Sequence, residues 1–240
     1  MSSNHAATQI SDLVTANHIL ANEGVFDGFG HVSLRHDQNP ERFWIARSMA
    51  PSLVTAEDIV ECDFEGVVHD SQGRKSYLER FIHCAIFKAR PDVMAIIHSH
   101  SPAIIPFGVT GARLRPICHM SGFLGSTTPV FEIRDTVGES SDMLIRNHAL
   151  GEALAQTLGG HAVALLRGHG NVVVGNSIKQ AVFRAIYTES NARLQAQAMQ
   201  MGEPVFLSED EARNSDETNS GQIERPWQLW KSKLSGDPQA

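Results

Sequence analysis

The sequence predicts a single α/β domain in which helices cover a sheet. Segments of helical periodicity alternate with short apolar strands along the 240 residues, as in α/β sandwiches. The strands cluster as short, antiparallel-looking pairs, and no Gly-x-Gly-x-x-Gly follows the first strand, so the pattern does not favour a doubly wound sheet. No Pro-, Gly- or Ser-rich linker separates two periodic halves, and we therefore treat residues 1–240 as one domain.

Each element is expected from its periodicity and its end signals. Residues 8–23 predict a helix that ends at Gly24, and residues 55–58 predict a short capped turn. Further helices are expected at residues 77–90, 149–158 and 178–201. Strands are expected at residues 29–35, 43–46, 59–64, 95–100, 114–117, 130–133, 162–166 and 172–174.

The C-terminal segment is harder to assign because it mixes charge with Trp227 and Trp230. We expect residues 208–240 to form a tail that packs on the site or on a neighbouring subunit. Its tryptophans either anchor the tail or cap a pocket, since an indole stacks well on a flat ring.

Composition excludes several classes of function. The net charge of −7 argues against non-specific nucleic-acid binding. No apolar run approaches 18 residues and the N-terminus lacks a signal-peptide pattern, so we expect no membrane association and a cytoplasmic location. The scattered Cys62, Cys84 and Cys118 are expected to be reduced thiols rather than a disulfide framework.

The first chemical signal is His98-Ser99-His100 at the end of an apolar strand. Residues i and i+2 of a strand point to the same face, with Cα atoms roughly 6.7 Å apart, and two imidazoles at this spacing can bind one cation. Pro102 favours departure from the sheet, which puts the histidines at its rim. His-x-His alone does not exclude two histidines without a ligand.

A second histidine motif strengthens the metal interpretation. Arg167-Gly168-His169-Gly170 places a histidine just after another apolar strand, between glycines that let the backbone turn sharply. Three histidines at strand ends, together with a nearby carboxylate, would form a catalytic metal site with an open position.

With Glu79 in Tyr77-Leu78-Glu79-Arg80-Phe81-Ile82-His83, these motifs resemble the class II aldolase/adducin family. The similarity runs from about residue 8 to residue 201, and the order and spacing of the three motifs make it specific. The resemblance implies a three-layer α/β/α sandwich whose mostly antiparallel central sheet has nine strands. It also implies a cyclic homotetramer with active sites at the subunit interfaces.

The resemblance further implies a role for each motif residue. It makes His98, His100 and His169 the ligands of one divalent metal per subunit, and Glu79 the acid/base or a labile fourth ligand. From its position alone, Glu79 would be a solvated helical residue. Three imidazoles and a carboxylate accept several metals, so we expect Mn²⁺ or Zn²⁺ first and Fe²⁺ or Co²⁺ as possibilities. No organic cofactor is expected.

The chain departs from the sugar-phosphate aldolases of this family where those proteins hold phosphate. His31 replaces the asparagine of a Gly-Asn-Val-Ser strand, Arg47-Ser48-Met49 replaces a Thr-Gly turn, and Tyr77-Leu78 replaces a Ser-Ser pair. These exchanges remove donors suited to a phosphate dianion and favour a planar carboxylate, which arginine binds bidentately. With the stretches at residues 116–125 and 225–230, they resemble a branch that decarboxylates hydroxylated aromatic or pyridine dicarboxylates.

We therefore expect a metal-dependent decarboxylase of an ortho-hydroxy aromatic, heteroaromatic or related unsaturated dicarboxylic acid. A divalent cation that holds the substrate oxygens would stabilise the enolate left by loss of CO₂, and a carboxylate near it can move the proton. The expected catalytic residues are Glu79, His119 and His31. The expected substrate-binding residues are His31, Arg47, Ser48 and Tyr77.

Alternatives remain at this point. His119 is equally well explained as a histidine whose hydrogen bonds are made with the backbone. The runner-up function is an aldolase or epimerase that acts on a non-phosphorylated hydroxy-keto acid or a sugar phosphate. A third is an adducin-like binding module without chemistry, which would need neither the histidines nor the glutamate.

Overall fold

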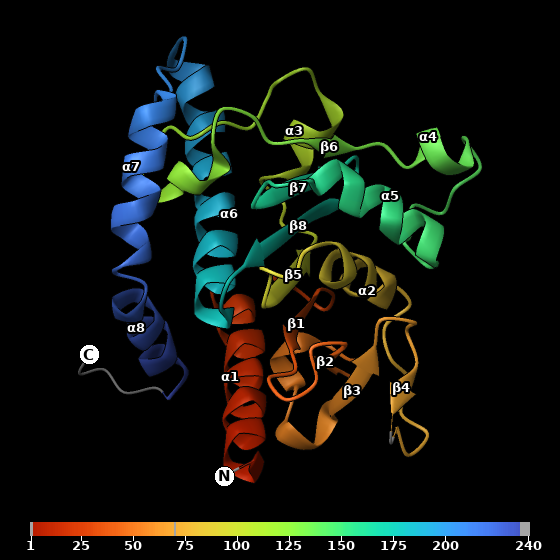
Figure 1. Cartoon of the computed structure of the whole chain (residues 1–240). Coiled ribbons are helices and arrows are strands. Elements are labelled where there is room, and N and C mark those ends of the chain that lie inside the picture. Colours follow the sequence, from red (N-terminus) through yellow and green to blue (C-terminus); the bar gives the residue numbers. More distant parts are fainter. Residues whose placement is uncertain (1, 70, 236–240) are drawn as a thin grey trace.

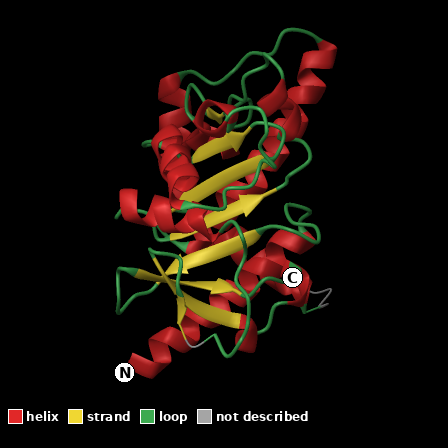
Figure 2. Cartoon of the chain, turned by 90° about the vertical axis from the view of Figure 1, so that its right-hand side faces the viewer, coloured by secondary structure: helices red, strands yellow, loops and turns green. Residues whose placement is uncertain are grey.

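The computed structural model of the protein describes residues 2–69 and 71–235, so residues 236–240 of the expected tail lie outside the described residues. One sheet runs through the molecule between two layers of helices (Figures 1 and 2). The strand order is β4-β3-β2-β1-β5-β8-β7-β6, and every neighbouring pair is antiparallel except β6 and β7. The fold is thus the expected α/β sandwich with a mostly antiparallel sheet.

The eight strands are short. They are β1 (His31–Arg35), β2 (Arg42–Ala46), β3 (Ile59–Asp63), β4 (Val68–His69), β5 (Ala95–Ser99), β6 (Val130–Phe131), β7 (Val163–Leu166) and β8 (Gly170–Gly175). The α-helices are α1 (Ser2–Asn22), α2 (Arg80–Ala89), α3 (Ile105–Val109), α4 (Arg134–Val137), α5 (His148–Leu158), α6 (Ile178–Met201), α7 (Glu209–Ser220) and α8 (Glu224–Leu234). Short 3₁₀ turns are η1 (Pro51–Leu53), η2 (Ala56–Asp58) and η3 (His119–Leu124).

Alternate residues of the central strands enter two separate apolar cores. In β5, Ala95 and Ile97 belong to the core under α1, α6 and α8, whereas Ile96 belongs to the core under α2 and α5. This alternation follows from the period of two along a strand. Figure 1 shows α1 and α6 on one side of the sheet and α2 and α5 on the other. A polar side chain on the second face therefore points toward α2.

One expected strand does not form. Residues 114–117 lie outside the sheet, which has eight strands in the described residues where the family resemblance implied nine. The backbone of this segment bonds to side chains of α6: Arg115 and Ile117 donate their amide hydrogens to Gln195 Oε1 and Asn191 Oδ1, both at 3.0 Å. Because these side chains satisfy its polar groups, the segment needs no neighbouring strand.

The C-terminal tail packs on its own chain. Ser208 caps α7, and a reciprocal bond with Glu211 completes a capping box. Helix α7 packs against η3, and α8 packs against α1 and α6. Trp227 and Trp230 lie in the core on this side of the sheet, 1% and 5% exposed. In the described part of the tail, residues 208–235, no residue lines the cavity described below, and both tryptophans lie in the core of their own chain.

Within the described ranges, we find no helix long and apolar enough to cross a membrane.

The burial of Trp227 gives a testable expectation for the tail. Trp227→Ala is expected to lower the free energy of unfolding by about 3–5 kcal/mol, because truncation of a buried tryptophan leaves a cavity. Leu229→Ala on the same helix is the matched control, since Leu229 is 46% exposed. Urea denaturation followed by circular dichroism measures both, and equal losses would contradict the packing of α8.

Candidate active site

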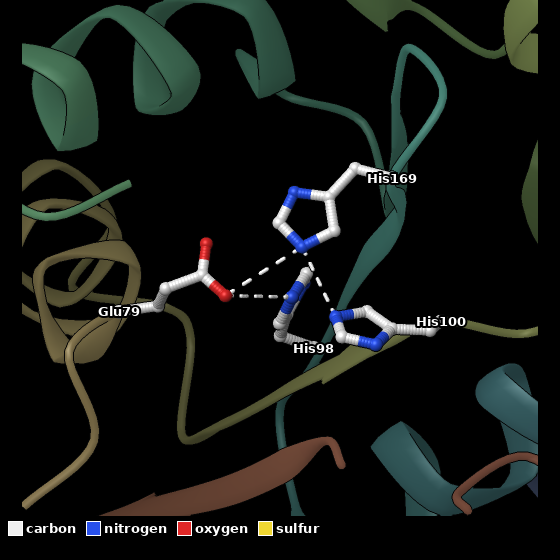
Figure 3. Close-up of side chains that lie close together, drawn as sticks. All are labelled: Glu79, His98, His100 and His169. Carbon is white, nitrogen blue, oxygen red and sulfur yellow. Dashed lines mark hydrogen bonds and ion pairs between the residues drawn. The ribbon is translucent and has the colours of Figure 1, made fainter. Parts of the chain in front are cut away.

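Three histidines and one glutamate meet at one edge of the sheet (Figure 3). Glu79, His98, His100 and His169 each contribute one nitrogen or oxygen, and these atoms all lie within 4.8 Å of one another. Glu79 Oε2 lies 3.5 Å from His98 Nε2 and 3.6 Å from His169 Nε2. The Nε2 atoms of His100 and His169 are 3.0 Å apart. We refer to these four residues as the histidine–glutamate cluster.

The cluster forms because β5 and β8 pair closely. His98 is on β5, His100 follows its end, and His169 lies in the tight turn that connects β7 to β8. Gly168 in this turn has a φ of +64°, which favours glycine. A Cβ atom on Gly170 would lie 2.0 Å from the backbone oxygen of Ser99. Glycine at position 170 thus permits the contact that brings His169 to the end of β5.

His98 is oriented by the strand beside it. Its Nδ1 lies 3.0 Å from the backbone oxygen of Asn171, an acceptor, so the ring hydrogen is on Nδ1. Nε2 then carries a lone pair, and this buried atom has no hydrogen-bond partner among the described residues. A histidine that binds a metal through one ring nitrogen commonly donates a hydrogen bond from the other ring nitrogen in this way.

Glu79 is held as a carboxylate at the N-terminus of α2. It is the N-cap residue of the helix, but its side chain makes no capping bond; instead Oε1 accepts a hydrogen bond from the amide of Ile145 at 2.9 Å. Burial raises the pKa of this carboxyl, but the neighbouring His98 and His169 lower it by a larger amount. The net pKa therefore lies well below its usual range. Glu79 is therefore ionised at neutral pH.

These groups fit a divalent cation. A carboxylate oxygen and three imidazole nitrogens at mutual distances of 3.0–4.8 Å approximate the roughly 3.4 Å that separates ligands around a tetrahedral ion with 2.1 Å bonds. Burial, followed by the neighbouring His98 and His169, lowers the pKa of His100 to about 4, so its ring is neutral and can act as a ligand. The lone pair of His98 Nε2 also faces other acceptors, an arrangement that a cation would stabilise.

A cavity of about 450 Å³ opens beside the cluster and is mostly apolar. Glu79, His98 and His100 lie in its wall. The polar side chains that line it besides these are His31, Ser48 and Tyr77. The remaining lining residues are Gly28, Phe29, Gly30, Met49, Ala50, Leu78 and Leu144. None of the lining residues in the described part of the chain is lysine or arginine.

Tyr77 offers a ring face rather than a free hydroxyl to this cavity. Its hydroxyl donates to the backbone oxygen of Met49 at 2.9 Å, and burial raises the pKa of Tyr77 to about 12. The ring packs on His31, with centroids 4.7 Å apart. Tyr77 thus supplies a flat, uncharged wall.

Two residues expected at the site lie elsewhere in this chain. Arg47 is not among the residues that line the cavity, and its Nε donates to Asp58 Oδ1 at 2.6 Å. His119 begins η3, which packs against α7, and its backbone oxygen accepts from Asn219 Nδ2. The structure brings neither of them to the cluster.

His83 is the residue near the site that sequence reasoning missed. It is fully buried on α2 and lies between two side chains of β1: His83 Nε2 is 2.6 Å from His31 Nδ1, and His83 Nδ1 is 2.6 Å from Ser33 Oγ. The period of two in β1 was a usable signal, because it places His31 and Ser33 on one face. The partner on α2 becomes visible only in the folded chain.

Comparison with known proteins agrees with this architecture. Residues 11–196 match the family described as Class II Aldolase and Adducin N-terminal domain. Decarboxylase tropJ of Talaromyces stipitatus is 35% identical over 94% of this chain and 93% of the relative. A 3,4-dihydroxyphthalate decarboxylase of Terrabacter sp. is 31% identical over 77% of this chain and 78% of the relative.

A solved structure extends the comparison to the fold. L-fuculose 1-phosphate aldolase from Glaciozyma antarctica PI12 superposes with a TM-score of 0.81 and 26% identity, over 98% of this chain and 93% of the other. The decarboxylases and this aldolase are all consistent with a lyase. Because the family match spans most of its length and tropJ aligns almost end to end, the chain belongs to the class II aldolase and adducin family.

Proposed function

We propose that the protein is a metal-dependent decarboxylase of an ortho-hydroxy aromatic, heteroaromatic or related unsaturated dicarboxylic acid. The observation that carries this proposal is the histidine–glutamate cluster, of which Glu79, His98 and His100 lie in the wall of an apolar cavity. Ring faces and aliphatic groups of Phe29, Met49 and Tyr77 suit a planar substrate. The names of the two relatives, both decarboxylases, support the same reaction class.

In this proposal, three histidines hold one divalent cation, with Mn²⁺ or Zn²⁺ as the first candidates. When bound, the cation supplies Lewis-acid stabilisation to the oxygens of the substrate. Glu79 takes the proton of the substrate hydroxyl group. Glu79 gives that proton to the ring carbon that bears the carboxylate, which forms the keto tautomer. The bond between this carbon and the carboxylate then breaks, CO₂ leaves, and the electron pair passes to the carbonyl oxygen as the enolate and restores the aromatic ring.

The polar groups of the cavity support a carboxylate better than a phosphate. A phosphate dianion is usually bound by arginine, lysine or several backbone amides, and no arginine or lysine is among the described lining residues. Outside the cluster, the polar side chains in the cavity wall are His31, Ser48 and Tyr77. The Tyr77 hydroxyl already donates to the backbone oxygen of Met49, which leaves His31 and Ser48 to face a substrate. We therefore assign carboxylate binding to His31 and Ser48 rather than to Arg47.

The second candidate is an aldolase that acts on a sugar phosphate or a hydroxy-keto acid. It is favoured by the structural similarity to L-fuculose 1-phosphate aldolase. Both candidates fit a homotetramer with sites at subunit interfaces, which we also propose and which light scattering measures directly. Phe29 and Leu78 at the cavity are 69% and 61% exposed, and such apolar side chains suit contact with a neighbouring subunit.

The metal site gives the first expectation. His98→Ala, His100→Ala and His169→Ala are each expected to weaken metal affinity by roughly 10–100-fold or more, because loss of even an outer partner of a ligand has that effect. Metal content of the purified variants, measured by plasma mass spectrometry, tests this. His161→Ala is the control, since His161 is exposed and lies outside the cluster. Wild-type occupancy in all three variants would rule the site out.

The role of Glu79 gives the second. Glu79→Gln keeps the shape of the side chain and one oxygen but cannot carry a proton. We expect turnover to fall by roughly 10²–10⁴-fold, the usual contribution of a general acid or base, while metal is retained. Normal turnover would assign the proton transfer to a residue other than Glu79.

The substrate class gives the third. We expect release of CO₂ from 3,4-dihydroxyphthalate or another ortho-hydroxy dicarboxylate and no cleavage of L-fuculose 1-phosphate. Each acid is incubated with the metal-loaded protein, and CO₂ is measured in parallel with aldehyde formation from the sugar phosphate. Efficient cleavage of the sugar phosphate, without activity on any hydroxy-dicarboxylate, would establish the aldolase instead.

A further inference from the structure

A chain of hydrogen bonds runs from the interior of the protein to the cavity. Ser33 Oγ lies 2.6 Å from His83 Nδ1, and His83 Nε2 lies 2.6 Å from His31 Nδ1. All three side chains are buried: Ser33 and His83 are inaccessible and His31 is 4% exposed. Of these three residues, only His31 lines the cavity, so the chain of hydrogen bonds ends at the cavity wall.

The direction of this chain follows from the hydroxyl group at its inner end. In the described part of the protein, His83 Nδ1 is the only group bonded to Ser33 Oγ. The hydroxyl hydrogen needs an acceptor, and a buried donor without one costs about 1–3 kcal/mol. Ser33 therefore donates to Nδ1 of His83, which puts the ring hydrogen of His83 on Nε2. His83 in turn donates to Nδ1 of His31.

This direction leaves one hydrogen on each imidazole. His83 accepts from Ser33 at Nδ1 and donates from Nε2, so its ring carries a single hydrogen. With Nδ1 of His31 occupied as an acceptor, the remaining hydrogen of that ring is on Nε2.

We propose that Ser33 and His83 are positioning residues that fix His31 in the tautomer with hydrogen on Nε2, so that His31 donates a hydrogen bond to a substrate oxygen beside the cluster. His31 pairs with His98 in the register of β1 and β5, and the two rings are 5.0 Å apart. The donor thus lies next to the groups expected to hold the metal. In this tautomer His31 cannot serve as the general base, and proton abstraction belongs to Glu79.

This inference rests on the proposed function only for the identity of the oxygen, a carboxylate or hydroxyl oxygen of the hydroxy acid. The tautomer can be measured without any substrate. Long-range ¹H–¹⁵N correlation spectra of the zinc-loaded protein report which nitrogen of each histidine carries hydrogen, and His31→Gln and His83→Gln spectra assign the signals. We expect hydrogen on Nε2 of both rings. Hydrogen on Nδ1 of either ring would overturn the proposal, whether or not the protein is a decarboxylase.

Affinity for salicylate, an ortho-hydroxy carboxylate, tests the function of the donor. Ser33→Ala removes the hydroxyl that sets the direction, and we expect salicylate to bind the zinc-loaded variant roughly 10–100-fold more weakly, the loss of one hydrogen bond to a charged group. Ser33→Thr restores a hydroxyl and is expected to recover affinity. Ser121→Ala is the matched control, because Ser121 is also buried and bonded, to Asn191 Oδ1, away from the cavity.

The outcomes separate the two proposals. The affinity for salicylate is measured by calorimetry. If Ser33→Ala loses no more affinity than Ser121→Ala, the hydrogen bonds from Ser33 to His31 do not affect binding and the inference is overturned. If Ser33→Ala loses affinity and Nε2 carries hydrogen in both rings, the inference stands even if CO₂ is never released, and the proposed function alone fails.

Discussion

The close pairing of β5 and β8 is the constraint on which the candidate site depends. The backbones approach so closely at Gly170 that a side chain there would meet the backbone oxygen of Ser99. This contact brings the turn that carries His169 to the end of the strand that carries His98. Across the same pair, the backbone oxygen of Asn171 fixes the tautomer of His98. One strand pairing therefore sets the positions of His98 and His169 and the tautomer of His98.

The surroundings of the cluster are unusually rich in buried polar side chains, and burial of such groups is costly unless they are bonded. His31, Ser33 and His83 satisfy one another, and Glu79 accepts the amide hydrogen of Ile145. Among the described residues, His98 Nε2 is a buried nitrogen without a hydrogen-bond partner, and it faces the centre of the cluster. Its lone pair thus lies where the chemistry is proposed.

Sequence patterns predicted those features that depend on local periodicity. The strand-end motifs of His98 and His169 needed only the period of a strand and two glycines, and the structure brings these residues together. Arg47 illustrates the limit, because its direction is set by the partner Asp58 on another segment. The helices of the tail went unassigned despite a readable Ser208-x-x-Glu211 capping signal, since high charge hid their apolar faces. The expected strand at residues 114–117 failed because amide side chains of α6 took its hydrogen bonds.

The register of β1 and β5 has a consequence for how this scaffold can change. His31 and His98 face each other from adjacent strands, yet the backbone of β1 carries none of the four residues of the cluster. A substitution at position 31 therefore alters the side chain that the cavity presents to a substrate and leaves in place the backbone that carries the histidine–glutamate cluster. In a directed-evolution experiment, substitutions at position 31 would change which substrates the cavity accepts, because position 31 lies on the strand next to the one that carries His98.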